Sequence, residues 1–98
     1  MRRAARTDGN HSTIVKALRA AGCGVVDLSG VGNGVPDLLV EAPVSPWAMT
    51  LLEVKDPSQP PNKQKLTPAQ VTFHAGWRWP LHVVRTVDEA LAAVGVRA

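Results

Sequence analysis

The sequence predicts an α/β domain in the order helix, three strands, helix, strand, helix, with a mixed four-stranded sheet flanked by helices. Two observations lead to this order. The apolar segments 32–41 and 49–55 flank a proline-containing stretch, a composition typical of a β-hairpin. Residues 49–85 then have the pattern of a strand, a helix and a strand. Such a unit needs a right-handed crossover, so its last strand is expected to run parallel to a hairpin strand.

The first helix is expected to begin near Asn10 and to end at Gly22, a residue typical of helix C-termini. Its apolar stripe consists of Ile14, Leu18 and Ala21. A short strand at 23–28 follows, and then the glycine-rich stretch 29–34. We favour a structural turn over a phosphate-binding loop there, because the stretch precedes a strand and so lacks a helix N-terminus.

The hairpin brings three charged residues together. If its turn is centred on Ser45, Asp37 lies directly opposite Glu53, with the two Cβ atoms roughly 5 Å apart. Lys55 comes two residues after Glu53 and therefore points to the same face. Two adjacent carboxylates repel each other unless a cation or a shared proton relieves them, and all-oxygen ligation suits Mg²⁺ or Mn²⁺. A lysine beside such a metal ion indicates phosphodiester hydrolysis; the alternative is a solvated hairpin face.

Residues 56–65 are polar and rich in proline, so a surface loop is expected. Its Lys63 and Lys65 are candidates for contacts with a DNA backbone, or else ordinary solvated charges. Thr67 and Gln70 form a predicted capping box at the start of the second helix. Gln70 is also a candidate for a hydrogen bond near the metal ion.

The second helix is expected to turn Val71, Phe73 and His74 inward and to end at Gly76. Trp77 and Trp79 follow on a turn. We expect them to cap the core, with stacking on unpaired bases or a subunit contact as alternatives.

The last strand is predicted at 81–85, and a second capping box, Thr86 to Glu89, opens the final helix. Leu91 and Val94 form its apolar face. We expect structural roles for His74 and His82, which lack metal-ligand spacing.

Composition indicates one domain, 10–98, behind a basic flexible arm at 1–9. The chain has 98 residues, 45% of them hydrophobic, and a net charge of +3 that fits a nucleic-acid partner. The arm contributes three further candidates for DNA contacts, Arg2, Arg3 and Arg6. The single cysteine, Cys23, favours a reducing compartment, and with no apolar run long enough to span a membrane we expect a cytoplasmic protein.

Four segments together resemble a known family. GVPDLLV at 34–40, LEVK at 52–55, LTPAQVTF at 66–73 and VRTVDEAL at 84–91 are similar to a stand-alone phage-type VRR-NUC domain, a virus-type replication-repair nuclease of the PD-(D/E)XK superfamily. The resemblance implies a restriction-endonuclease-like αβββαβα core and metal-dependent cleavage of DNA. It also implies a homodimer that resolves four-way (Holliday) junctions, in the bacterial host cytoplasm if the gene is carried by a phage.

By the same resemblance, Asp37 and Glu53 are the expected metal ligands, the Val54 carbonyl is an additional oxygen ligand, and Lys55 is the catalytic lysine. Gln70 matches the glutamine of the family's second helix. The sequence departs from the family at His11, where the first helix usually supplies a further acid. Because imidazole binds Mg²⁺ poorly, a histidine ligand there predicts a preference for Mn²⁺; otherwise His11 is an exposed helix-start residue.

Two other functions remain possible on sequence grounds. One is a nucleic-acid-binding module of the same fold with weakened or lost catalysis, which would bind DNA without cutting it. The other is a small interaction protein whose carboxylate pair is accidental, which would neither bind DNA nor gain stability from metal.

Overall fold

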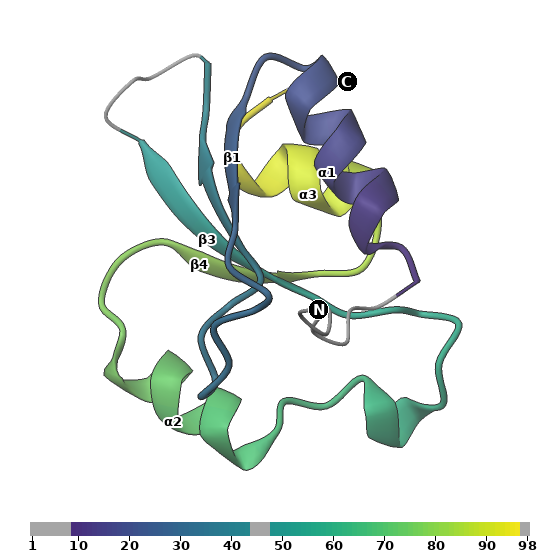
Figure 1. Cartoon of the computed structure of the whole chain (residues 1–98), viewed down its shortest axis with the longest axis vertical. Helices are drawn as coiled ribbons and strands as arrows, with labels where there is room; N and C mark the ends of the chain where they lie inside the picture. Colours follow the sequence, from purple (N-terminus) through teal and green to yellow (C-terminus); the bar gives the residue numbers. More distant parts are fainter. Residues whose placement is uncertain (1–8, 44–47, 97–98) are drawn as a thin grey trace, which may run out of the picture.

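The computed structural model describes residues 9–43 and 48–96, so most of the predicted basic arm, including Arg2, Arg3 and Arg6, lies outside the described residues. Figure 1 shows the elements in the predicted order. They are α1 (His11–Ala20), β1 (Gly24–Asp27), β2 (Leu38–Glu41), β3 (Met49–Val54), the short 3₁₀ helix η1 (Pro61–Lys63), α2 (Pro68–Gly76), β4 (Leu81–Val84) and α3 (Val87–Ala93).

The four strands form one mixed sheet in the order β1-β2-β3-β4. β1, β2 and β3 are antiparallel neighbours, and β4 runs parallel to β3, as the crossover argument predicted. Within the hairpin, Leu38 pairs with Leu52 and Val40 with Thr50. This is the register predicted from a turn centred on Ser45, and extended by one position it places Asp37 opposite Glu53.

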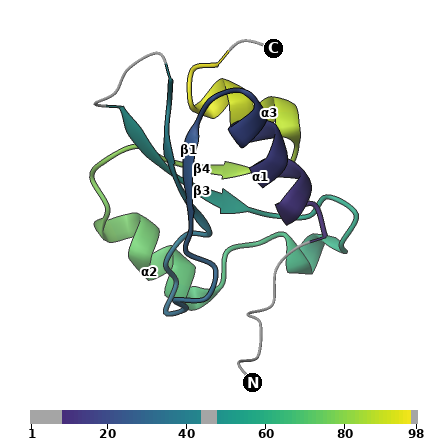
Figure 2. The same cartoon turned by 45° about the horizontal axis from the view of Figure 1, so that its top comes forward.

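One face of the sheet carries the hydrophobic core. Leu38, Leu52 and Val54 point to this face and are at most 2% exposed. They pack with Ile14 and Leu18 of α1, and α3 adds Ala90 to the same cluster. Figures 1 and 2 both show α1 and α3 lying together beside the sheet, away from α2. Because side chains alternate along a strand, Leu51 and Glu53 point to the opposite face.

Helix α2 serves that opposite face, since its Gln70 contacts both Glu53 and Lys55. The helix contributes no fully buried residue. Val71 is 53% exposed, so the prediction that it points inward is wrong. A helix lying flat on the sheet would bury such a residue, whereas α2 lies beside the glycine-rich stretch that precedes β2, as both views show.

Three other local predictions need correction. The proline-rich loop contains the 3₁₀ helix η1, because Pro61 pre-sets the backbone for a helical turn. The second capping box is only half formed: Thr86 accepts from the Glu89 N–H, but the Glu89 carboxylate accepts from the N–H of Arg85 rather than of Thr86. Trp79 is 64% exposed and absent from the core cluster, so it does not cap the core.

Cys23 is buried, and burial raises the pKa of its thiol. Across the described ranges, no helix is long and apolar enough to cross a membrane.

Candidate active site

The start of β2 and the end of β3 are joined through Asp37. Its Oδ2 accepts a hydrogen bond of 2.8 Å from the Val54 N–H, and its backbone carbonyl accepts one of 2.7 Å from the N–H of Leu28. The carboxylate is thereby held against the backbone at the C-terminal end of β3. Because the N–H and C=O of one strand residue point to the same side, the Val54 carbonyl lies on the Asp37 side of β3.

Glu53, Lys55 and Gln70 form a buried polar network. Gln70 Nε2 donates to Glu53 Oε2 at 3.1 Å, and Lys55 Nζ donates to Gln70 Oε1 at 2.9 Å. Lys55 Nζ also lies 4.0 Å from Glu53 Oε2. Glu53 is 2% and Lys55 is 6% exposed, so neither charge is solvated by bulk water. A buried ion pair of this kind costs desolvation energy that Coulomb attraction only partly repays, which is common at functional sites.

Gln70 forms the predicted capping box and also contacts two residues of the candidate site; its hydrogen bond near a metal ion stays a prediction. Its Oε1 accepts from the Thr67 N–H at 2.9 Å, and Thr67 Oγ1 accepts from the Gln70 N–H, which completes the capping box of α2. The same Oε1 accepts from Lys55. The helix start therefore fixes the amide that aligns Glu53 with Lys55.

The glycine-rich stretch positions α2. Gly34 has φ +80°, and a Cβ there would clash with the Ala69 backbone carbonyl. Only glycine permits this close approach with a left-handed backbone. The stretch is therefore a structural turn, which places the N-terminal turn of α2 beside the hairpin and Gln70 over Glu53.

A second set of contacts ties the start of α1 to the end of β3. Asn10 Nδ2 donates to the carbonyls of Lys55 at 3.1 Å and Arg85 at 2.7 Å. The Gly9 N–H donates to Asp56 Oδ2 at 3.1 Å. Hydrogen bonds from Ser58 lower the pKa of Asp56. These long-range bonds were not predicted, because no local sequence pattern marks them.

His11 is 6% exposed, so the alternative of an exposed helix-start residue is wrong. Its Nε2 lies 3.0 Å from Oδ2 of Asp27, an acid that the sequence interpretation missed. Burial opposes ionisation of Asp27, but hydrogen bonds from the Ser29 hydroxyl and N–H, together with His11, outweigh it and lower the pKa of Asp27 to about 2. Asp27 thus supplies a negative charge beside His11. The Asp-x-Ser turn at the end of β1 was the available signal.

His74 also lies nearer the site than expected. It follows Gln70 by one helical turn, and its Nε2 is buried with no hydrogen-bond partner among the described residues. Burial, and secondarily repulsion by Lys55, lower the pKa of His74. His74 is therefore a neutral neighbour of Lys55, whereas His82 lies on the exposed part of β4.

The donors at this site suit a hard divalent ion. Asp37 and Glu53 offer carboxylate oxygens, and the Val54 carbonyl offers a neutral one. Across residues 9–43 and 48–96, no three His, Cys, Asp or Glu side chains are grouped so as to hold one metal ion. Mg²⁺ commonly binds through one or two carboxylates and keeps several waters, so two acids fit such an ion. The structure does not group His11 with Asp37 and Glu53, and its role as a ligand stays a prediction.

The predicted DNA contacts are only partly described. Lys63 and Lys65 are both exposed on the loop between β3 and α2, which leaves the site directly after Lys55. Their position on the surface allows contact with a DNA backbone but does not by itself demonstrate it.

Comparison with known proteins places this arrangement in context. A scan against protein-family models finds no match, and a search of the curated proteins finds none either. Among solved structures, one described as a VRR_NUC domain matches with a TM-score of 0.58 and 27% sequence identity. The match covers 85% of this chain and 91% of that chain.

The fold is that of a PD-(D/E)XK-type nuclease, an α/β domain with a mixed four-stranded sheet and three helices. More narrowly, the match supports a VRR-NUC domain, which confirms the resemblance seen in the four sequence segments. A nuclease domain implies DNA binding, and nucleases of this fold generally use divalent metal ions.

Proposed function

We propose that the protein is a divalent-metal-dependent endonuclease that cuts branched DNA as a homodimer. The observation that carries the proposal is the buried network in which Gln70 joins Glu53 to Lys55, beside Asp37 on the neighbouring strand. An acid and a lysine buried together cost desolvation free energy, and such groups are common at functional sites.

Each group of candidate residues has a separate role in the proposed reaction. Asp37, Glu53 and the Val54 carbonyl would hold Mg²⁺ or Mn²⁺, which would supply polarisation of the phosphate and activation of water for attack. Lys55, oriented by Gln70, places a positive charge where negative charge develops on the phosphate during attack. Lys63 and Lys65, with Arg2, Arg3 and Arg6, contact the DNA backbone through charge, independently of sequence.

Dimerisation follows from the symmetry of the substrate. A subunit with one such site makes one cut, whereas a four-way junction with two-fold symmetry requires two symmetric cuts. The alternative function is a DNA-binding module that has lost catalysis, for which the histidine at position 11 is the sequence argument.

The test is cleavage of four-way junction, flap, single-stranded and duplex DNA in Mg²⁺, Mn²⁺ or EDTA, compared with Asp37→Ala. We expect junction cutting that requires both metal and Asp37. DNA that is bound but uncut in every metal would instead establish the binding module.

The metal preference tests His11 separately. If His11 takes the place of an acidic ligand, wild-type activity is higher in Mn²⁺ than in Mg²⁺, and His11→Glu raises the rate in Mg²⁺. Equal wild-type rates in the two metals would remove His11 from the metal site and leave it as the buried partner of Asp27.

A further inference from the structure

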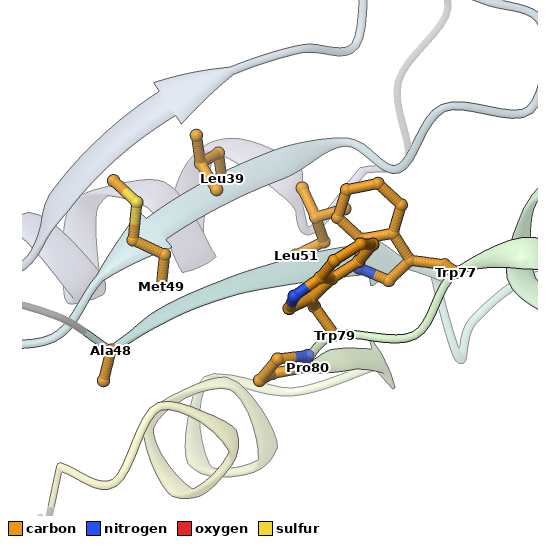
Figure 3. A pocket seen from close by; sticks show the side chains of 7 residues that line it. All are labelled: Leu39, Ala48, Met49, Leu51, Trp77, Trp79 and Pro80. Atoms are coloured by element: carbon orange, nitrogen blue, oxygen red, sulfur yellow. The ribbon is translucent and has the colours of Figure 1, made fainter.

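The sheet face that carries Glu53 also carries an apolar pocket of about 430 Å³, within the usual size range of ligand sites. Figure 3 shows that Leu39 and Leu51 come from the strands, while Trp77, Trp79 and Pro80 come from the connection between α2 and β4. Among the described residues, no charged side chain lines the pocket. Its walls therefore suit a flat, weakly polar group.

The aromatic side chains of the pocket form a continuous ladder. Phe73 and Trp77 are stacked, with ring centroids 5.3 Å apart and an interplanar angle of 21°. Trp77 and Trp79 meet edge to face at 5.1 Å. The ladder is anchored on α2 at one end and is open at the other, since Trp79 is 64% exposed. An exposed tryptophan held by a neighbouring ring is a preorganised stacking surface.

The pocket lies within reach of DNA bound at the candidate active site. Leu51 and Glu53 are two residues apart on β3 and point to the same face, a separation of about 7 Å. This distance is about two base steps of a DNA strand, each roughly 3.4 Å. Arg78 lies between the two tryptophans in sequence and is exposed, so the connection that carries them also carries a positive charge.

Charge favours DNA over a second copy of this chain as the occupant. In a two-fold contact the same surface is used by both copies, so the connections that carry Arg78 would come close together with like charges. In the part of the chain that the structure describes, no acid lines the pocket to offset those two charges. A nucleic acid instead offers a flat base for the tryptophans and a phosphate for Arg78.

We propose that the Trp77–Trp79 pocket binds an unpaired nucleobase one or two nucleotides from the cleaved phosphodiester. The inference rests on the proposed nuclease function and adds a source of substrate selectivity. A branch that carries unpaired nucleotides presents an unstacked base, whereas continuous duplex keeps its bases paired and would have to open. Each stacked base contributes to affinity without regard to sequence, so the pocket recognises structure and not a base sequence.

The test measures binding in EDTA, where no cutting occurs, by wild type, Trp79→Ala and Trp79→Phe. The probes are a junction carrying unpaired nucleotides at the branch and a continuous duplex of equal length. We expect Trp79→Ala to weaken binding of the branched probe about tenfold, the loss of one stacked base, with duplex affinity unchanged and Trp79→Phe close to wild type. The fluorescence of 2-aminopurine at the unpaired position should be quenched by wild type and not by Trp79→Ala.

Each other outcome overturns the inference. Equal weakening for duplex and branched probes would make Trp79 a general surface contact. A wild-type dimer that becomes monomeric in Trp79→Ala, measured by sedimentation velocity, would assign the pocket to the subunit interface. Unchanged binding of both probes, alongside cleavage that depends on Asp37, would reject the pocket and leave the nuclease intact. If wild type neither binds nor cuts DNA, both proposals fail.

Discussion

At the residue scale, metal binding is expected to relieve the electrostatic repulsion between the carboxylates of Asp37 and Glu53. Asp37→Asn keeps an oxygen to accept from the Val54 N–H but removes one negative charge. A ligand that binds the folded state at 100 times its Kd stabilises it by about 2.7 kcal/mol. We therefore expect Mg²⁺ or Mn²⁺ to raise the thermal unfolding midpoint of wild type by several degrees and that of Asp37→Asn much less.

Asp88→Asn is the matched control, because Asp88 is an exposed acid on α3. It should respond to metal as wild type does. If the midpoint of Asp37→Asn rises as much as that of wild type, then Asp37 is not a metal ligand.

The Asp27 carboxylate predicts a pH dependence of stability. Its pKa falls from an ordinary 3.8 to about 2 in the folded protein, so folding favours the ionised form. A lowered folded pKa contributes stability above about pH 4, which is lost as the pH falls toward 2. The side chain is 47% exposed, so solvent screens part of this contribution.

Urea unfolding of wild type and Asp27→Asn measures this contribution. The wild-type advantage in the free energy of unfolding should be fully present at pH 5 and should shrink below pH 4. An advantage that does not change between pH 5 and pH 2.5 would contradict the depressed pKa.

The sequence predicted the local part of the site and missed the distant part. Asp37 and Glu53 could be paired because a hairpin register follows from its turn and from the period of two along a strand. The contact of His11 with Asp27, and those of Asn10 with Lys55 and Arg85, join separate elements. Such contacts depend on how α1 docks on the sheet, which no spacing along the chain specifies.

At the element scale, two substitutions at the start of α2 distinguish its effect on helix stability from its effect on the candidate active site. Thr67→Ala removes the side-chain cap and is expected to cost about 1 kcal/mol of stability. It leaves the contacts of Gln70 with Glu53 and Lys55 in place, so cleavage should stay within about threefold of wild type. Gln70→Ala removes half of the capping box together with both site contacts.

We therefore expect Gln70→Ala to lose a similar amount of stability but about 100-fold in cleavage rate, within the range found when one oriented hydrogen-bonding group is removed. Chemical denaturation and single-turnover cleavage of junction DNA, well below the unfolding temperature, provide the two readouts. Equal cleavage by the two variants would reduce Gln70 to a helix-capping residue.

The same helix shows where element prediction succeeds. The start of α2 could be predicted because a capping box is encoded by four consecutive residues, and the structure contains this capping box. The predicted orientation of Val71 was wrong because it depends on where α2 docks. The close approach of Gly34 to Ala69 places the helix at the end of the sheet. Local hydrogen bonds are encoded locally, whereas the packed face of a short helix is not.

At the scale of the whole molecule, the topology was predictable because the crossover rule leaves few arrangements for a hairpin followed by a helix and a strand. The chain measures 33 × 32 × 27 Å, which is close to the length of one turn of duplex DNA. A single site on such a subunit faces one strand of a branch at a time. Two simultaneous cuts therefore require a second subunit.

This requirement predicts the behaviour of mixed dimers. Wild-type and Asp37→Ala chains, co-expressed with different tags and purified through both, should give a dimer with one functional site. On a supercoiled plasmid that extrudes a cruciform, wild-type dimers should yield linear product from two coordinated cuts. Mixed dimers should yield nicked circles, because only one strand is cut before the junction is lost by relaxation. Linear product from the mixed preparation at the wild-type rate would show that each subunit acts alone, and the paired-cut proposal would then fail.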